Sequence, residues 1–164
     1  MGFLAEIFMK TLFFDDIIDK ESVTDLIESI EEVEDDNIKI YFQSEGGGHD
    51  YMQVLSDYVN THKDKTFHFI VNWHVGSAAF DLFLDLKCKK SILDGAYAMT
   101  HLYNRMINTS DTSDENEHLL QNLNDTNKRL LDKVKPYLTE DEFTKLKNKE
   151  DIYINTERLR LIVS

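Results

Sequence analysis

Two stretches of the sequence decide the fold, and they read IKIYFQSEGGG over residues 38–48 and TFHFIVNWHVGSAAF over residues 66–80. In the first, apolar residues alternate with more polar ones and a run of three glycines follows, which is typical of a strand that ends in a tight turn. In the second, a mainly apolar run leads into small residues, which predicts a buried strand over residues 66–72 followed by a helix. The two stretches therefore predict two strand-to-helix turns built from small residues.

The flanking residues extend this pattern into an alternation of strands and helices. An amphipathic helix is expected from Ser22, with Ser22 and Asp25 as a predicted capping box, and a second helix around residues 51–59. Further short strands are expected over residues 11–14, 89–93 and 97–102. Strands that alternate with helices predict right-handed crossovers, so the expected fold class is α/β with a mainly parallel sheet.

The last third of the sequence predicts mostly helix. Residues 108–117 are polar and turn-rich, which indicates a loop, and a leucine-rich pattern over about residues 115–135 predicts a long helix that ends near Pro136. Thr139 and Glu142 have the spacing of a capping box at the start of another helix. A short extended piece over residues 151–154 and a terminal helical segment over residues 156–162 complete the expected elements.

Length and charge limit the classes of protein that fit. A chain of 164 residues is long enough for one sizeable core and short for two, so residues 1–164 are expected to form a single domain. The formal net charge of −13 argues against nucleic acid or an anionic membrane as a partner, because phosphate binding needs clustered lysine and arginine.

The cysteine count and the N-terminal residues indicate a location. Cys88 is the only cysteine, so the sequence predicts no disulfide, which fits a reducing compartment. The apolar opening, residues 1–14, is interrupted by Glu6 and Lys10, and it resembles neither a signal peptide nor a membrane span. We expect a cytoplasmic protein of a bacterium or of a virus that infects one.

Ser77 and His101 are the residues whose chemistry stands out. Ser77 lies at the second strand-to-helix turn, where the N–H groups of a helix N-terminus favour a developing negative charge. His101 follows 24 positions later, and a neutral imidazole can take the serine proton and return it to a leaving amine. From the residues alone, Ser77 is either such a nucleophile or a simple helix N-cap.

The glycine run offers a second element of an acyl-transfer site. Gly46 and Gly47 would let the backbone approach a substrate carbonyl and point N–H groups at it, although three glycines can also simply form a turn. The other five histidines show no metal-like spacing with Cys88 or a carboxylate. The sequence therefore predicts no metal site and no cofactor.

Four segments in this order resemble the proteolytic subunit of the Clp protease, within the wider Clp protease/crotonase fold. IKIYFQSEGG over residues 38–47 is similar to the family segment I-x-I-Y-I-N-S-P-G-G, and VGSAAF over residues 75–80 is similar to its nucleophile turn. AMTH over residues 98–101 resembles the segment that bears the catalytic histidine. Residues 115–134 fall where that family has its long handle helix.

The resemblance implies a serine peptidase that hydrolyses peptide bonds and assembles into a ring-like homo-oligomer through the long helix. The implied site residues are the nucleophile Ser77, the base His101, the orienting acid Asp151 or Glu150, and the oxyanion-hole glycines Gly46 and Gly47. The alternative is an inert protein that keeps the fold as an oligomeric scaffold or partner subunit. A crotonase-like acyl-CoA site is a third possibility, because fold does not fix function.

The chain also departs from the family pattern. Glu45 replaces the family proline, which puts a carboxylate close to the implied oxyanion hole. Matching Phe80 and His101 to the family without a gap puts Gly76 at the nucleophile position, whereas the Ser-Ala-Ala variant of the motif puts Ser77 there. Aligning the last expected strand on residues 151–154 places the family aspartate near Lys147. Only about ten residues precede the first expected strand, so the family's longer N-terminal segment, which helps dock an ATP-driven unfoldase, has no obvious counterpart. This weakens the inference of an unfoldase partner.

Overall fold

The computed structural model describes residues 10–104 and 113–163. Its strands are β1 (Lys10–Asp15), β2 (Asn37–Ser44), β3 (Thr66–Gly76), β4 (Lys89–Ile92), β5 (Tyr97–Thr100) and β6 (Ile152–Ile154). They form one sheet in the order β1-β2-β3-β5-β6, and β4 pairs with β3 off this path. The β1–β2, β2–β3, β3–β4 and β3–β5 pairs are all parallel, which confirms the α/β class predicted from the alternation of strands and helices.

β3 is the longest strand because it has two partners in succession. Its residues 68–71 pair with β4, and its residues 74–76 pair with β5. The sequence predicted this strand only as far as Asn72, since the apolar run ends there. Pairing with β5, rather than local periodicity, keeps the chain extended to Gly76.

Helices follow the strands as the alternation predicted. They are α1 (Lys20–Glu31), α2 (His49–Thr61), α3 (Ala78–Asp85), α4 (Ser113–Val134), the 3₁₀ helix η1 (Lys135–Tyr137), α5 (Glu140–Lys147) and α6 (Thr156–Val163). The capping box predicted at Ser22 and Asp25 is wrong. The N-cap is Asp19, whose side chain accepts from the Ser22 N–H while the Ser22 hydroxyl accepts from the Asp19 N–H, because α1 begins before its first periodic residue.

The described residues gather into two compact units, one within Met1–Met99 and Tyr153–Ser164 and the other within Thr100–Ile152. The first unit contains most of the sheet with α1, α2, α3 and α6, and the second contains α4, η1 and α5. The expectation of a single domain over residues 1–164 stays a prediction.

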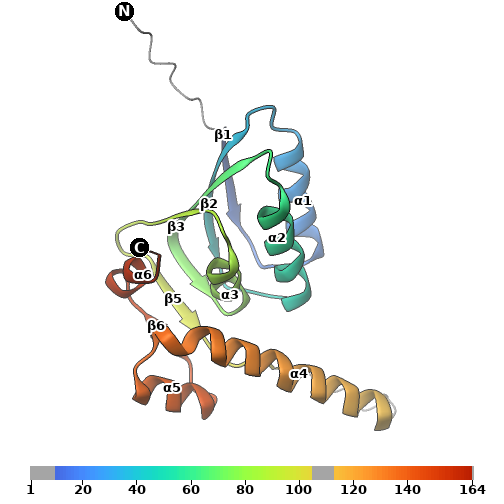
Figure 1. Cartoon of the computed structure of the whole chain (residues 1–164), viewed down its shortest axis with the longest axis vertical. Coiled ribbons are helices and arrows are strands. Elements are labelled where there is room, and N and C mark those ends of the chain that lie inside the picture. Colours follow the sequence, from blue (N-terminus) through green and yellow to red (C-terminus); the bar gives the residue numbers. More distant parts are fainter. Residues whose placement is uncertain (1–9, 105–112, 164) are drawn as a thin grey trace, which may run out of the picture. The chain divides into compact units, whose positions relative to one another are not determined.

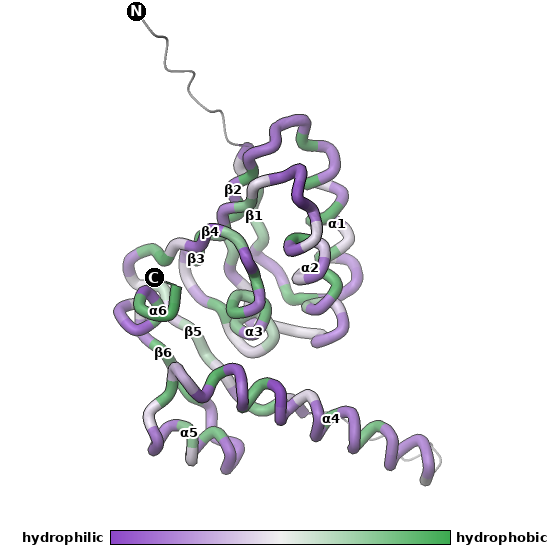
Figure 2. Tube along the Cα trace, viewed as in Figure 1, coloured by the Kyte–Doolittle hydropathy of each residue, from purple (hydrophilic) through white to green (hydrophobic). Residues whose placement is uncertain are grey.

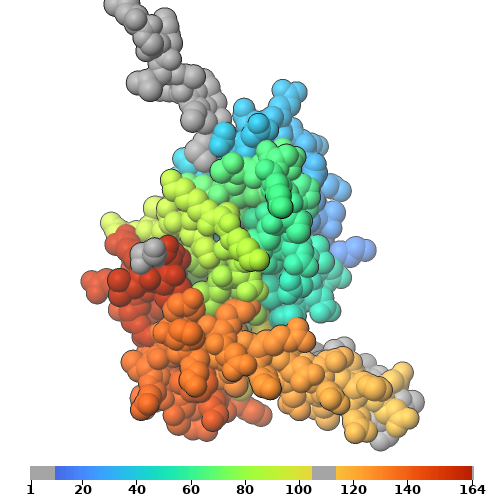
Figure 3. Space-filling model, viewed as in Figure 1, coloured from blue at the N-terminus to red at the C-terminus, as the bar shows by residue number. Residues whose placement is uncertain are grey.

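The core of the first unit follows from alternation along its strands. Ile38, Ile40 and Phe42 of β2 are fully buried, whereas the residues between them are partly exposed. In β1, Phe14 is buried while the neighbouring Phe13 is 73% exposed. α1 and α2 run side by side along one face of the sheet (Figure 1), and their side chains lie against one another (Figure 3). Burial of each large apolar side chain contributes roughly 1.5–3 kcal/mol.

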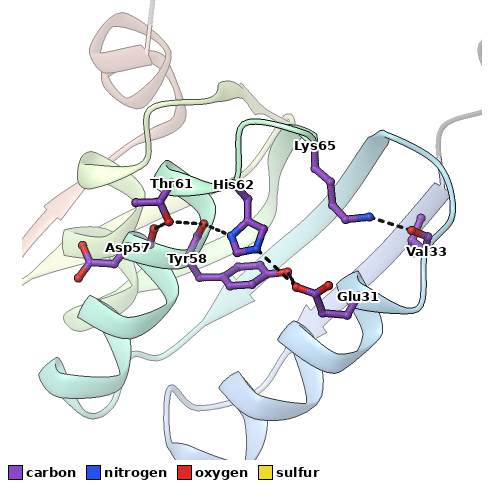
Figure 4. Close-up of polar contacts among 7 residues, drawn as sticks. All are labelled: Glu31, Val33, Asp57, Tyr58, Thr61, His62 and Lys65. Atoms are coloured by element: carbon purple, nitrogen blue, oxygen red, sulfur yellow. Dashed lines mark hydrogen bonds and ion pairs between the residues drawn. The ribbon is translucent and has the colours of Figure 1, made fainter.

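A polar network ties the C-terminal ends of α1 and α2 together (Figure 4). The Tyr58 hydroxyl donates to the Glu31 carboxylate, and the His62 ring stacks on Tyr58 with 3.9 Å between ring centroids. His62 Nε2 lies 3.5 Å from Glu31 Oε1, and Lys65 Nζ donates to the Val33 carbonyl at 2.8 Å. This network therefore fixes the pairing of the two helices at one end of the unit.

The second unit is helical, and most of its sequence predictions hold. Thr139 and Glu142 form the predicted capping box at the start of α5. The Asn127 side chain accepts from the Tyr103 N–H at 2.7 Å and donates to the Tyr103 carbonyl at 3.0 Å, which holds α4 to the segment after β5.

The predicted loop over residues 108–117 is wrong from Ser113 onward, because α4 begins there; residues 108–112 lie outside the described part of the chain. Hydrophilic residues interrupt the apolar ones throughout α4 (Figure 2). In the part of the chain that the structure describes, no helix has the length and apolar character needed to cross a bilayer.

Candidate active site

Ser77 occupies the sharp turn between β3 and α3. Its backbone lies at φ 51° and ψ −122°, in a region that residues other than glycine rarely adopt. Although Ser77 is formally the N-cap of α3, its side chain accepts no capping hydrogen bond from the first turn of that helix. Helix capping therefore does not account for a serine here, and a strained strand-to-helix turn is the geometry that presents the nucleophile in α/β-hydrolases.

Gly76 has a different role, as the last residue of β3. A side chain at this position would place Cβ 2.8 Å from His74 Nε2 and 3.0 Å from the Glu45 carbonyl oxygen. The first distance is shorter than real Cβ contacts and the second is at the tight limit, so close packing accounts for glycine at this position. The residue in the turn itself is Ser77.

The glycine run packs directly against this turn. Gly46 and Gly47 have φ values of 106° and 147°, which only glycine adopts easily. A Cβ on Gly46 would lie 2.7 Å from the Gly76 carbonyl oxygen and 2.8 Å from Ser77 Cβ, and a Cβ on Gly47 would overlap the Ile18 backbone. The two strand-to-helix turns predicted from the sequence thus meet within the first unit.

The N–H groups near this meeting point are not equivalent as oxyanion donors. The Gly46 N–H donates to Ser44 Oγ at 3.1 Å, so Gly46 can serve as an oxyanion donor only if this bond breaks when substrate binds. Ala78 is the first residue of α3, so its N–H has no acceptor within that helix. The sequence analysis did not identify this donor. The signal was available, because the amide after the nucleophile is a common oxyanion donor at such turns.

His101 and Asp151 lie together in the second unit. His101 Nδ1 is 3.9 Å from Asp151 Oδ1, within ion-pair range, and the two side chains are 30% and 51% exposed. Lys147, which falls near the family aspartate in the alignment, lies in the last turn of α5. The Glu150 N–H donates to the Lys145 carbonyl at the end of that helix.

The chain that leads to His101 passes the Ser77 turn. The Ser77 N–H donates to the Met99 carbonyl at 2.8 Å, as an extension of the pairing between β3 and β5. His101 follows Met99 by two residues. Strand pairing thus fixes the Ser77 turn beside Met99 of β5, within the first unit.

A concave pocket lies at the carboxyl ends of β1 and β2, where open α/β sheets usually bind ligands. Its volume is about 260 Å³, and its lining includes Asp15, Asp16, Glu45, Trp73 and His74. Glu45 Oε1 lies 3.4 Å from His74 Nδ1. The Glu45 carboxylate therefore has the His74 ring as a neighbour within its own unit.

A serine and a histidine are in contact between β3 and β4. His68 Nε2 and Ser91 Oγ are 2.8 Å apart, and burial, together with Lys89 and Lys39, lowers the pKa of His68. Ser91 is a residue of a regular strand, without a glycine turn or a helix N-terminus to bind an oxyanion. We therefore regard this pair as structural.

Metal ligation is not indicated by the described residues. Within residues 10–104 and 113–163, no three histidine, cysteine, aspartate or glutamate side chains gather where they could hold a metal ion.

Comparison with known proteins identifies the fold. No model of a known protein family matches the chain, and no curated protein matches it. Among solved structures, a point mutant of ClpP1 from Listeria monocytogenes is similar with a TM-score of 0.68, covering 94% of this chain and 87% of its own. The chain therefore has a Clp protease-like fold, as the sequence predicted. At 18% sequence identity, the likeness shows the fold alone.

Proposed function

We propose that this protein is a serine-type peptidase of the Clp proteolytic-subunit kind, with Ser77 as its nucleophile. The observation that carries the proposal is the backbone of Ser77, held at positive φ between β3 and α3 where helix capping gives no reason for a serine. A strained residue persists only where the surrounding structure holds it, and such residues cluster at active sites.

The proposed reaction follows the acyl-transfer pattern. Ser77 Oγ attacks the peptide carbonyl carbon while His101 Nε2 takes the hydroxyl proton, and the tetrahedral intermediate collapses when His101 returns that proton to the leaving amine. Water then attacks the acyl carbon while His101 takes one of its protons, and the second tetrahedral intermediate breaks the bond to Ser77 Oγ. His101 returns the proton to Ser77 Oγ, and the acid product leaves. Asp151 orients His101 through Nδ1, a role supported by the 3.9 Å separation.

We assign the oxyanion hole to the Gly46 and Gly47 amides, and we add the Ala78 amide as a donor. The support is the close approach of Gly46 to Ser77 and Ala78, with a Cβ on Gly46 falling 3.0 Å from the Ala78 nitrogen. Each donor of this kind is worth roughly 3 kcal/mol in hydrolases where it has been removed. The reaction requires no cofactor.

The proposal extends to assembly and location. We propose a ring-like homo-oligomer that packs through α4, peptides or unfolded proteins as substrates, and a cytoplasmic location. The amphipathic pattern of α4 supports the first of these, since Leu120 is 44% exposed on a helix of 22 residues. An ATP-driven unfoldase, nucleic acid and membrane are not included.

A fluorophosphonate probe tests the proposal, because it modifies only an activated serine. We expect labelling of the wild-type protein at Ser77, its loss in Ser77→Ala, and a loss of roughly 10³-fold or more in His101→Ala. Ser91→Ala is the matched control, because it removes a serine whose hydroxyl contacts a histidine, His68. Well-folded wild-type protein without labelling would refute the peptidase and favour the inert scaffold.

A further inference from the structure

Glu45 and His74 make a contact between the two turns of the candidate site that the proposed reaction does not use. His74 is buried on β3, its Nδ1 lies 3.4 Å from Glu45 Oε1, and its ring packs on Tyr97 of β5 with 4.8 Å between centroids. The Glu45 side chain is 79% exposed. The histidine is therefore the fixed partner of this pair, and the glutamate is the one able to move.

Glu45 is also next to the atoms that would surround an oxyanion. Its carbonyl oxygen lies 3.0 Å from the Cβ position of Gly76, and the following residue, Gly46, closely approaches Ser77. A Glu45 carboxylate that turned away from His74 toward this turn would bring a negative charge near the developing oxyanion. The repulsion between the carboxylate and the oxyanion would raise the free energy of the transition state and so slow the reaction.

We propose that His74 is a positioning residue that holds the Glu45 carboxylate away from the reaction centre at Ser77. This inference rests on the proposed function. It explains how a glutamate can occupy position 45, beside the glycines of the proposed oxyanion hole. Among the described residues, the other titratable groups near the ring are Tyr97, whose ring packs against it at a tilt, and Asp15 and Asp16, which line the same pocket.

A double-substitution cycle tests the proposal. His74→Leu fills a similar space but has no donor, so it frees the Glu45 carboxylate, and we expect the rate of fluorophosphonate labelling to fall roughly 3- to 10-fold. Adding Glu45→Gln removes the freed charge, and we expect the double variant to recover to within about twofold of Glu45→Gln alone. A general loss of packing around position 74 would not be rescued in this way.

His62→Leu is the matched control, because His62 and Glu31 form a second histidine–glutamate pair, at 3.5 Å, that lies on α1 and α2 (Figure 4). We expect it to leave the labelling rate unchanged. If His74→Leu does not accumulate as folded protein, His74→Gln replaces it, since its amide does not occupy the Nδ1 position. Labelling of His74→Leu at the wild-type rate, or a double variant as slow as His74→Leu, would overturn the proposal.

Amide hydrogen exchange at Gly46 and Gly47 gives a readout that needs no hydrolysis. We expect exchange at these two amides to rise roughly fivefold in His74→Leu and to stay unchanged in His62→Leu, because the turn loses a contact only in the first. Wild-type protein that resists labelling refutes the proposed function, and the exchange rates then decide whether His74 holds the turn. Unchanged exchange in His74→Leu overturns the inference.

Discussion

At the scale of single residues, Ser77 has a backbone conformation that glycine adopts easily and that is strained for a residue with a side chain. Because its φ is 51°, we expect Ser77→Gly to raise the free energy of unfolding by about 1 kcal/mol while it abolishes fluorophosphonate labelling. Urea unfolding measures the first effect. Lys149→Gly is the control, since Lys149 also has positive φ, at 68°, in the other unit and should gain stability without losing labelling. A Ser77→Gly variant that is less stable than wild type would contradict backbone strain at this turn.

Gly46 allows a second test at the residue scale, because its conformation and its close packing can be separated. Gly46→Ala introduces both backbone strain, at φ 106°, and a Cβ 2.7 Å from the Gly76 carbonyl oxygen. Gly95→Ala introduces strain alone, since Gly95 has φ 81° and no atom within 4 Å of its Cβ position. We expect a loss of about 1 kcal/mol for Gly95→Ala and at least about 2 kcal/mol more for Gly46→Ala in urea unfolding. Equal losses would show that the two turns do not touch.

At the scale of elements, the Tyr58 hydroxyl links the C-terminal ends of α1 and α2 through its hydrogen bond to Glu31. Burial, followed by the hydrogen bond to Glu31, raises the pKa of Tyr58 above its ordinary value. A group whose pKa is raised on folding contributes stability that is complete below the unfolded pKa, about 10 for tyrosine, and that is lost as pH rises beyond it. We therefore expect wild-type stability to fall above about pH 10 more steeply than that of Tyr58→Phe.

The same substitution has a cost near neutral pH. Tyr58→Phe leaves the Glu31 carboxylate without this donor, and we expect a loss of about 1 kcal/mol in urea unfolding at pH 7. Tyr153→Phe is a suitable control, because Tyr153 is 63% exposed on β6. Parallel stability curves for the wild type and Tyr58→Phe between pH 9 and 11 would refute the role of the hydroxyl.

At the scale of the whole molecule, the proposed assembly makes α4 a contact surface between subunits. We expect light scattering at micromolar concentration to give a mass several times that of the 19.2 kDa chain. Leu120→Asp places a charge on the exposed apolar side of α4 and should shift the protein toward a smaller species. Asn122→Asp, which adds the same charge at an exposed polar position, should not. A wild-type monomer would contradict the assembly.

The alternation of apolar residues decides where most elements lie, because that pattern is local. The strand at residues 38–43, the stripe of α2 and the capping box at Thr139 and Glu142 were all predictable in this way. The predictions failed where a strand has a partner far along the chain or where a helix cap lies outside the apolar pattern. β3 continues past Asn72 because β5 lies beside it, and the true N-cap of α1, Asp19, precedes the apolar pattern.

The candidate site divides in the same way. The sequence by itself determined the α/β class, the two small-residue turns and the presence of Ser77 and His101, since these follow from composition and spacing along the chain. Only the tertiary structure decided that Ser77 rather than Gly76 forms the strained turn, that Gly46 packs against it, and that Glu45 has His74 as a partner. Those facts depend on backbone dihedrals and on contacts between residues about 30 positions apart, which no local pattern records.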